Sequence, residues 1–413
     1  MVEVASMETL KFLMITTHFP PFHLGGDAVL VDYLSRELAR RGHEVHVLHN
    51  PTVYKMLRPA SETGSSDDID DGIRRHQYKP RLGKYQPWIN LTLGLSGMPS
   101  RMASELAKTV KPDVAHWHNT RGFIGVPMQL RNEICLYTSH DYGAICPRSN
   151  LLKPNLEICS AARMCTACSL RWRKPPQLWR VMGGRVLELQ DEIRIISPSQ
   201  FVADRLSDEG LRVHKVLRNF VPDPGPINRE RSAKRNALIY LGMLEIHKGL
   251  HTLVKAFIKS NDRQGFELDI IGEGSLRSEL IEAITKAELQ NRVHVHGFLE
   301  RTEAEALRKS ALAQIVPSEW LENCPLTILE AFAMGIPVIG SEMGGIPEIV
   351  GPDSGSIVFR AGDVDVLADT IVDLWQRREE LAGLGKRARN AYETRFRPDI
   401  HMAEYLRIIN GSI

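Results

Sequence analysis

The chain alternates short, β-branched apolar runs with longer stretches of helical periodicity. In the first half the apolar runs are LKFLMITT, EVHVLHN, DVAHWHN, ICLYTS and EIRIISPS. In the second half they are NALIYLG, FELDIIG, RVHVHG, LAQIVPS and PVIGS, each followed by a helical pattern. Such strand–helix alternation predicts an α/β protein with parallel sheets that are covered by helices on both faces.

Three segments between these runs indicate how the chain is organised. Ala28 to Arg41 is the clearest helical pattern of the first half, and Gly42 is its stop signal. Arg218 to Asn236 is rich in proline and charge and has no apolar period, which predicts an interdomain linker. Pro59 to Gly72 has too few apolar residues to pack, so we expect a mobile surface loop there. The pattern predicts two doubly wound domains that face a central cleft.

Composition and charge narrow the class of protein. The 413 residues are 43% hydrophobic and 25% charged, which is typical of a globular protein. A formal charge of +2 argues against a general nucleic-acid binder, which needs a basic excess to neutralise phosphates. No apolar run approaches the roughly 18 residues of a membrane span, and an N-terminus with Glu3 and Glu8 is unlike a secretory signal. We therefore expect a cytoplasmic protein.

Polar residues follow the strands of the first half, where open α/β sheets bind their ligands. Gly25-Gly26 precedes a helix start, so the backbone can approach a ligand and offer free N–H groups to an anion. DVAHWHN ends with His116 and His118, and ICLYTS leads into His140-Asp141. A glycine pair alone is a common turn, and one histidine alone is more often structural. Two successive strands that end in histidine favour a site.

The second half shows a similar pattern with a cation. Lys248-Gly249 opens a helix after NALIYLG, and GEGSL (Gly272 to Leu276) is a glycine-rich helix entry after FELDIIG. A lysine at a helix start is by itself a common surface feature. Anion sites in both halves would fit a ligand that contains a diphosphate.

Two carboxylates lie around the helix that Pro325 opens. Glu330 is embedded in an otherwise apolar helical stretch, and a buried charge without a partner is very costly. Paired hydroxyls of a sugar or ribose would satisfy its two oxygens. Glu322 precedes the helix, beside the backbone N–H groups of residues 323, 324 and 326. The alternative is an internal salt bridge for Glu330 and a solvated Glu322.

Together these motifs, in this order, resemble the GT-B retaining glycosyltransferases of glycosyltransferase family 4 (glycosyl transferases group 1). The resemblance covers nearly the whole chain. It rests on the Gly25-Gly26 loop, the TSHD turn at Thr138 to Asp141, HKGL, IIGEGSLRSEL, and the acid pair in ENCPLTILEAFAMGIPVIGSEMGGIPEIV.

The resemblance implies an activity and a domain layout. The activity is transfer of a sugar, with retention, from a nucleotide-diphosphate donor to a glycan, lipid-linked or small-molecule acceptor, without an organic cofactor. Residues 1–224 would form the acceptor-side domain, with a cysteine-rich insertion at 146–168. Residues 225–392 would form the donor domain, and 393–413 a helix that crosses back to the first domain.

The resemblance also implies roles for single residues. Glu330 would bind the ribose, Glu322 the donor sugar, and Lys248 the diphosphate, while His140 would lie by the donor sugar near the reacting carbon. The base would lie near Gly297 to Leu299. The further donor-binding candidates are Gly25, Gly26, Gly274, Phe298, Asn323, Cys324, Pro325 and Leu326, and the weaker acceptor-side candidates are His118 and Asp141.

One departure from the family pattern concerns the diphosphate clamp. The family usually has an arginine five residues before the lysine, and here that position is Met243. The acid loop also reads ENCP rather than the commoner EGFG. Two alternatives therefore stay open: a GT-B isomerase or phosphorylase, and a catalytically impaired partner that binds sugar nucleotides.

Four of the six cysteines fall in one short segment after His140. The spacing of Cys146, Cys159, Cys165 and Cys168 matches a structural four-thiolate zinc site, which would organise a segment poor in apolar period. An iron–sulfur cluster would use the same thiolates, and two disulfides are disfavoured in a reducing cytosol.

RWRKPPQLWR, Arg171 to Arg180, interleaves cations with Trp172 and Trp179. This composition favours contact with the acceptor or with an anionic membrane surface, at the cytoplasmic face. The alternative is a solvated helix entry.

Overall fold

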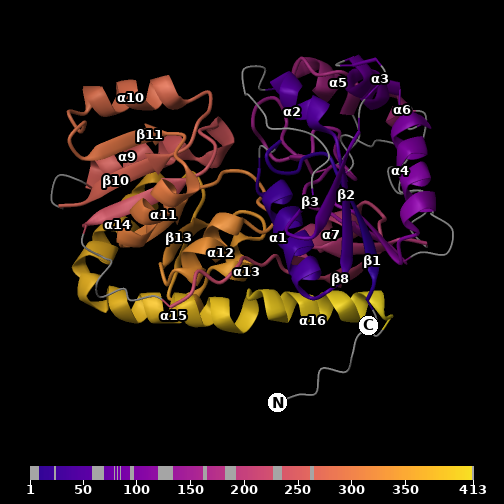
Figure 1. The fold of residues 1–413 in the computed structure, drawn as a ribbon. Helices are drawn as coiled ribbons and strands as arrows, with labels where there is room; N and C mark the ends of the chain where they lie inside the picture. Colours follow the sequence, from indigo (N-terminus) through magenta and orange to yellow (C-terminus); the bar gives the residue numbers. More distant parts are fainter. Residues whose placement is uncertain are drawn as a thin grey trace. The chain divides into compact units, whose positions relative to one another are not determined.

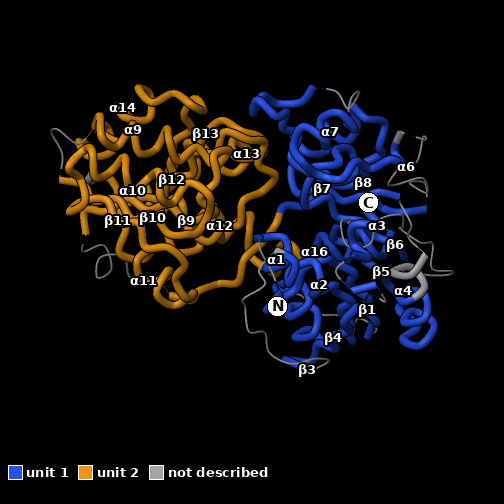
Figure 2. Tube along the Cα trace, turned by 90° about the horizontal axis from the view of Figure 1, so that it is seen from above, with its two compact units in different colours: residues 1–218, 402–413 blue, residues 219–401 orange. Residues whose placement is uncertain are grey.

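A computed structural model of the chain describes residues 9–22, 25–57, 69–78, 80, 82–83, 85–93, 97–119, 134–160, 165–181, 192–226, 235–260 and 265–411. The chain divides into two compact units. Unit 1 comprises residues 1–218 together with 402–413, and unit 2 comprises residues 219–401 (Figure 2).

Unit 1 is built on an eight-stranded sheet of order β3-β4-β2-β1-β5-β6-β7-β8 (Figure 1). All neighbours in this sheet pair parallel except β3, which runs antiparallel to β4 at the edge. Its strands are β1 (Lys11–Thr16), β2 (Glu44–His49), β3 (Ile69–Asp70), β4 (Ile73–Gln77), β5 (Val114–Trp117), β6 (Ile134–Thr138), β7 (Arg194–Ser197) and β8 (Val213–Val216).

The helices of unit 1 connect these strands. They are α1 (Gly26–Arg40), α2 (Pro51–Leu57), α3 (Tyr85–Leu93), α4 (Gly97–Val110), α5 (Cys165–Arg171), α6 (Leu178–Val181) and α7 (Gln200–Asp208). Helix α1 forms because apolar residues recur at helical spacing, and its buried face includes Leu30, Leu34 and Leu38. It begins at Gly26, two residues before the predicted start, because the extended Gly25 serves as its N-cap.

Unit 2 is built on a six-stranded, all-parallel sheet of order β11-β10-β9-β12-β13-β14. Its strands are β9 (Ala237–Leu241), β10 (Glu267–Ile271), β11 (Val293–Gly297), β12 (Ala313–Val316), β13 (Val338–Ser341) and β14 (Ile357–Phe359). The helices after them are α9 (Leu250–Ser260), α10 (Arg277–Lys286), α11 (Arg301–Ser310), α12 (Leu326–Ala333), α13 (Ile346–Ile349), α14 (Val364–Gln376) and α15 (Leu381–Arg395).

The last helix, α16 (Pro398–Ile409), contributes residues to both units, with the division at His401/Met402. Its final turns complete the core of unit 1. Met402 and Tyr405 are fully buried there, and the Tyr405 ring stacks on Phe12 of β1 at a centroid distance of 6.3 Å. Arg194 of β7 donates to the backbone carbonyl of Ile409 at 2.9 Å, which ties the end of the helix to the sheet.

The predicted α/β fold is confirmed, and all ten predicted strands are strands of the two sheets. The pattern missed β3, β4, β8 and β14. Strand β4 reads IRRHQ and lies near the edge of its sheet, so it lacks the apolar run that marks a central strand. Strand β14 has three residues, and β3 has two. Such short edge strands leave little periodicity to detect.

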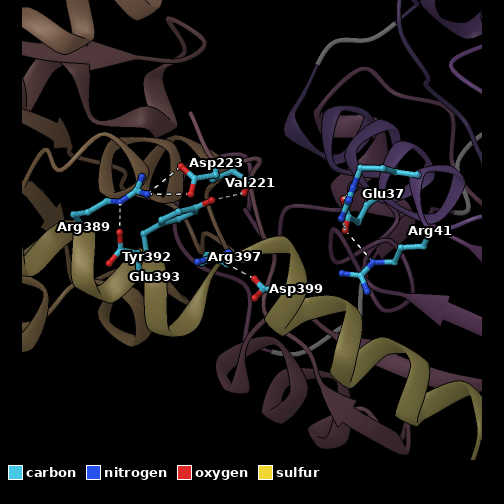
Figure 3. Close-up of polar contacts among 10 residues, drawn as sticks. Glu37, Arg41, Val221, Asp223, Arg389, Tyr392, Glu393, Arg397 and Asp399 are labelled. Atoms are coloured by element: carbon cyan, nitrogen blue, oxygen red, sulfur yellow. Dashed lines mark hydrogen bonds and ion pairs between the residues drawn. The ribbon is translucent and has the colours of Figure 1, made fainter. Parts of the chain in front are cut away.

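The first residues of the predicted linker, Arg218 to Asn236, pack against unit 2. The chain passes from one unit to the other at Arg218/Asn219, and the residues that follow belong to unit 2. Asp223 accepts two hydrogen bonds of 3.0 Å from Arg389 on α15, and Tyr392 donates to the carbonyl of Val221 at 3.1 Å (Figure 3). Residues 227–234 of this stretch, and residues 59–68 of the predicted loop, lie outside the described residues. Within the described ranges, no helix combines the length and apolar content that a membrane crossing requires.

Candidate active site

Three histidines of unit 1 lie in or just after strands β5 and β6, and His118 contacts the other two. His118 Nδ1 and His140 Nε2 share a hydrogen bond of 3.0 Å, and their rings stack at 15° with centroids 5.2 Å apart. His116 and His118 have ring centroids only 3.9 Å apart. The sequence therefore identified residues that the fold brings together, because neighbouring parallel strands end at the same edge of the sheet.

The polar partners of His116 lie on both sides of its ring. Its Nε2 is 2.8 Å from the hydroxyl of Thr138, and its Nδ1 is 2.8 Å from the hydroxyl of Tyr405 on α16. Tyr405 lies 289 residues away in sequence, and no local signal pointed to it. His116 is thus held in a fixed orientation by two hydroxyl groups.

Burial lowers the pKa of His140 to about 4, although the carboxylate of Asp27 opposes this shift. The imidazole is therefore neutral near pH 7, so it can offer one donor and one acceptor nitrogen. A neutral histidine suits recognition of sugar hydroxyls better than recognition of phosphate.

The loop between β1 and α1 is held by Asn119, which sequence reasoning did not select. Its side-chain oxygen accepts a hydrogen bond of 2.9 Å from the backbone N–H of Thr17, and its amide nitrogen lies 3.3 Å from Asp27 Oδ2. Asp27 is in the first turn of α1, directly after Gly25-Gly26. A carboxylate at this helix N-terminus competes with an anionic ligand for the same free N–H groups. Asp141, an acceptor-side candidate, accepts a hydrogen bond of 2.7 Å from the backbone N–H of Gly143 and so organises the turn after His140.

In unit 2 the predicted cation and acid form a buried ion pair. Lys248 Nζ lies 2.7 Å from Glu322 Oε1, and the hydroxyl of Ser318 donates to the same oxygen at 2.6 Å. The Lys248 ammonium also lies 4.8 Å above the ring of Trp320. Only 7% of Glu322 is exposed, so the alternative of a solvated Glu322 is wrong.

The charge of Glu322 is stabilised by these neighbours. Burial by itself raises the pKa of this carboxyl, but the charge and hydrogen bond of Lys248 and the hydroxyl of Ser318 outweigh it, so the pKa lies below the ordinary value. Glu322 is therefore ionised at neutral pH, and it lies beside Lys248 in the loops that follow β12 and β9.

The loop that carries Glu322 is fixed by a glycine pair that we had not assigned. Gly345 N–H donates to the carbonyl of Glu322 at 2.7 Å. Gly344 has a φ of +62°, and a Cβ at this position would overlap the backbone oxygen of Glu322. Only glycine therefore allows the SEMGG segment to lie against the acid loop.

Glu330 on α12 has an internal partner. Arg308, near the end of α11, donates from Nη1 to Glu330 Oε2 at 2.8 Å. Arg308 is 4% exposed, whereas 24% of the Glu330 side chain is exposed. The salt bridge that we considered as an alternative is therefore present. It occupies one carboxylate oxygen and leaves Oε1 available to a ligand.

The other donor-side candidates lie in the loops that follow the strands. The ring of Phe298, after β11, is 73% exposed, and its backbone N–H donates to Glu273 at 3.3 Å. Gly274 lies so close to the backbone of Leu244 that a Cβ would overlap it, which explains a glycine there by packing alone.

The residues between the two acids lie in a fixed turn. Cys324 accepts a hydrogen bond of 2.9 Å from Asn219 through its carbonyl, Pro325 is the N-cap of α12, and Leu326 begins the helix. Asn323 is 8% exposed. Met243, where the family arginine was expected, is 46% exposed.

The four clustered cysteines do not form the predicted metal centre. In the described part of the chain, no group of three or more His, Cys, Asp or Glu side chains has an arrangement that could hold a metal ion. Cys146, Cys159, Cys165 and Cys168 do not form disulfide bonds. Burial raises the pKa of Cys165 to about 11, with the neighbouring Cys146 as the next cause, so this thiol is protonated. The zinc prediction and its iron–sulfur and disulfide alternatives are therefore not supported.

Comparison with known proteins identifies the class. The family description "Glycosyltransferase Family 4" matches residues 24–222, and "Glycosyl transferases group 1" matches residues 227–391. Glycogen synthase of Mycobacterium tuberculosis is 26% identical over 359 residues, which cover 83% of this chain and 80% of that protein.

Solved structures share the fold over the whole chain. Sucrose-phosphate synthase from Thermosynechococcus elongatus superposes with a TM-score of 0.71 at 18% identity, over 98% of this chain and 100% of that one. Anabaena Alr3699/HepE, solved in complex with UDP-glucose, gives a TM-score of 0.68 at 16% identity, over 97% and 100% of the two chains. The protein is a glycosyltransferase with the GT-B fold. It belongs to glycosyltransferase family 4.

Proposed function

We propose that the protein transfers a sugar, with retention at the anomeric carbon, from a nucleotide-diphosphate sugar to a hydroxyl of a glycan, lipid-linked or small-molecule acceptor. The observation that carries this proposal is the buried Lys248–Glu322 pair at the strand ends of unit 2, with Glu330 on the helix that follows. Relatives include a glycogen synthase, and one fold neighbour was solved with UDP-glucose, which supports a nucleotide sugar as donor.

Unit 2 would hold the donor. Oε1 of Glu330 would accept a hydrogen bond from a ribose hydroxyl, while Arg308 keeps the carboxylate in position through Oε2. The exposed ring of Phe298 offers a face for the base. Glu322 and the backbone N–H groups after it would orient the sugar, and Lys248 would stabilise the negative charge of the diphosphate as it leaves.

The transfer forms a bond between the acceptor oxygen and the anomeric carbon and breaks the bond from that carbon to the phosphate oxygen. The acceptor proton passes to an oxygen of the leaving diphosphate on the same face. His140 of unit 1 would act as a neutral hydrogen-bonding group for the donor sugar, with His118 and Asp141 on the acceptor side. The exposed Met243 supplies no charge, so the phosphate contacts depend more strongly on Lys248 and on helix N-termini.

Binding and turnover of three variants test this proposal. Lys248→Ala should reduce kcat by roughly 100-fold or more, because it removes transition-state charge stabilisation. Glu330→Ala should act mainly on donor KM. Lys259→Ala is a matched control, since that lysine forms an exposed ion pair with Asp365 in the same unit. A panel of nucleotide sugars in a thermal-shift assay identifies the donor, because bound ligand raises the melting temperature by mass action.

Product analysis separates the alternatives. An isomerase or phosphorylase would convert its substrate without a sugar acceptor, and an impaired partner would bind the donor without turnover across acceptors. Near wild-type kinetics in both site variants would contradict the assignment.

A further inference from the structure

The exposed aromatic residues of unit 1 are not those of the Arg171 to Arg180 segment. Trp179 is buried, and its Nε1 donates to the carbonyl of Leu91 at 3.2 Å. Trp172 packs under the guanidinium of Arg148, whose Cζ lies 4.1 Å from the ring centroid. The tryptophans of this segment thus fasten α5 and α6 to the unit, and they do not form an apolar surface.

Among the described residues of unit 1, most of the exposed large apolar side chains lie on and around α3, and the others are Ile158 and Leu170. We call those on and around α3 the α3 surface: Leu82 (55% exposed), Tyr85 (65%), Trp88 (50%), Leu93 (47%) and Leu178 (39%). Tyr85 and Trp88 are three residues apart, so they lie on one face of the helix. Leu178 begins α6, which packs on α3 through the Trp179–Leu91 contact. Figure 1 shows α3, α5 and α6 in the same region of the unit.

The charges of this region are of one sign. Helix α3 contains no charged residue, and residues 72–104 around it contain no acidic residue. Residues 158–187, which carry α5 and α6, also contain no acidic residue. Their basic residues are Arg163, Arg171, Arg173, Lys174, Arg180 and Arg185. Arg171, Arg173 and Lys174 are exposed. The whole chain has a net charge of only +2, so this one-sided distribution is local.

We propose that the α3 surface, together with Arg171, Arg173 and Lys174, binds the interface of an anionic lipid bilayer. Exposed Trp, Tyr and Leu side chains insert at the boundary between headgroups and acyl chains, and nearby arginine and lysine pair with anionic headgroups. Binding of a nucleic acid would not explain why aliphatic side chains are exposed on this surface. Binding of a protein partner would not explain why two separate segments lack acidic residues. The proposal concerns binding alone, so it stands apart from the chemistry proposed above.

Vesicle co-sedimentation of the full chain tests it. We expect binding to vesicles that contain about one third phosphatidylglycerol and little binding to pure phosphatidylcholine. Tyr85→Ser/Trp88→Ser and, separately, Arg171→Glu/Arg173→Glu/Lys174→Glu should each weaken binding by roughly tenfold or more. Only the charge variant should change the salt dependence, because exposed charges are screened.

Ile281→Ser/Val366→Ser is the matched control, since both side chains are exposed apolar residues of unit 2 at 41% and 40%. It should bind vesicles like the wild type. Circular dichroism and turnover of a water-soluble acceptor verify that each variant is folded and active, which separates this proposal from the catalytic one. Absence of vesicle binding by the wild type, or equal binding by all variants, would overturn it. A wild-type dimer that the α3 variants convert to monomer would also overturn it, because the surface would then join two copies.

Discussion

The two sheets present different chemistry at the same structural position. At the carboxyl ends of β5 and β6 in unit 1, the central groups are histidines that are joined to one another and to the hydroxyls of Thr138 and Tyr405, with the carboxylates of Asp27 and Asp141 nearby. At the strand ends of unit 2, the groups are charged and paired, as in Lys248–Glu322. The same architecture therefore places a cluster of hydrogen-bonded histidines in one unit and a buried lysine–glutamate ion pair in the other.

The difference follows from the way in which burial changes the ionisation of the key residue in each unit. In unit 1, burial lowers the pKa of His140 to about 4 and keeps the ring uncharged. In unit 2, burial would also disfavour the charge of Glu322, but an ammonium 2.7 Å away holds the pKa of this carboxyl below its usual range. Neutral groups suit the hydroxyls of sugars, whereas a fixed ammonium suits a diphosphate. This difference supports the proposal that unit 2 holds the donor diphosphate and that unit 1 contacts sugar hydroxyls.

The largest effect should come from breaking the charged pair of unit 2. Glu322→Gln leaves the Lys248 ammonium, 15% exposed, without its carboxylate, and we expect a loss of about 3–5 kcal/mol in unfolding free energy. Asp365→Asn removes one partner of the exposed Lys259 pair and should cost less than about 1 kcal/mol. Urea denaturation measures both losses in unfolding free energy. Equal losses would show that the buried pair stabilises the fold no more than the exposed pair does.

A smaller loss of unfolding free energy is expected when the glycine contact with the backbone of Glu322 is disturbed. Gly344→Ala places a Cβ against the backbone of Glu322 at a positive φ, so we expect a loss of about 2–3 kcal/mol and a higher donor KM. Gly351→Ala is the control, because no heavy atom lies within 4 Å of its added Cβ. A Gly344→Ala variant as stable as this control would mean that the acid loop does not depend on the glycine contact.

The unfolding free energy measured as a function of pH tests the protonation of His140 in unit 1. The pKa of His140 is about 4 in the folded protein and about 6.5 when unfolded, so the unfolded state binds the proton first as pH falls. Its contribution to stability is complete above pH 6.5 and is lost between pH 6.5 and 4. His140→Gln should therefore flatten the fall in unfolding free energy over this range. Parallel curves for the wild type and His140→Gln would contradict the assignment.

The smallest effect should come from removing one neutral hydrogen bond of unit 1. Tyr405→Phe loses the 2.8 Å contact with His116 but keeps the buried ring, so we expect a loss of about 1 kcal/mol. Because the change acts through His116 and His118 on His140, imidazole NMR signals of the three histidines should shift. Tyr85→Phe, an exposed control, should change neither. Unshifted signals in Tyr405→Phe would show that the tyrosine serves packing alone.

Sequence patterns predicted the groups that adjoin strand ends, because such positions follow from local periodicity. Lys248, Glu322 and the three histidines were found in this way. Their partners were not, since a partner depends on tertiary placement: Arg308 meets Glu330 from another helix, and Tyr405 meets His116 from the far end of the chain.

Side-chain exposure could not be predicted either. The tryptophans of RWRKPPQLWR were expected at the surface, yet Trp179 is buried, and the exposed aromatic residues in the described part of unit 1 are Tyr85 and Trp88 on α3. The four cysteines matched the spacing of a metal site and lie near one another, but spacing does not fix the geometry of the thiols, and the described residues contain no group that could hold a metal ion.

The last turns of α16 have a consequence for the order of events during synthesis. Domains usually fold as they leave the ribosome, the N-terminal one first. Here Met402, Tyr405 and Ile408, which fill the core of unit 1, are translated after the whole of unit 2. The core of unit 1 therefore stays incomplete beside Phe12 of β1 and His116 of β5 until residues 402–408 have cleared the exit tunnel. A released chain that ends at residue 401 would contain every residue of unit 2 but would lack this part of the core of unit 1.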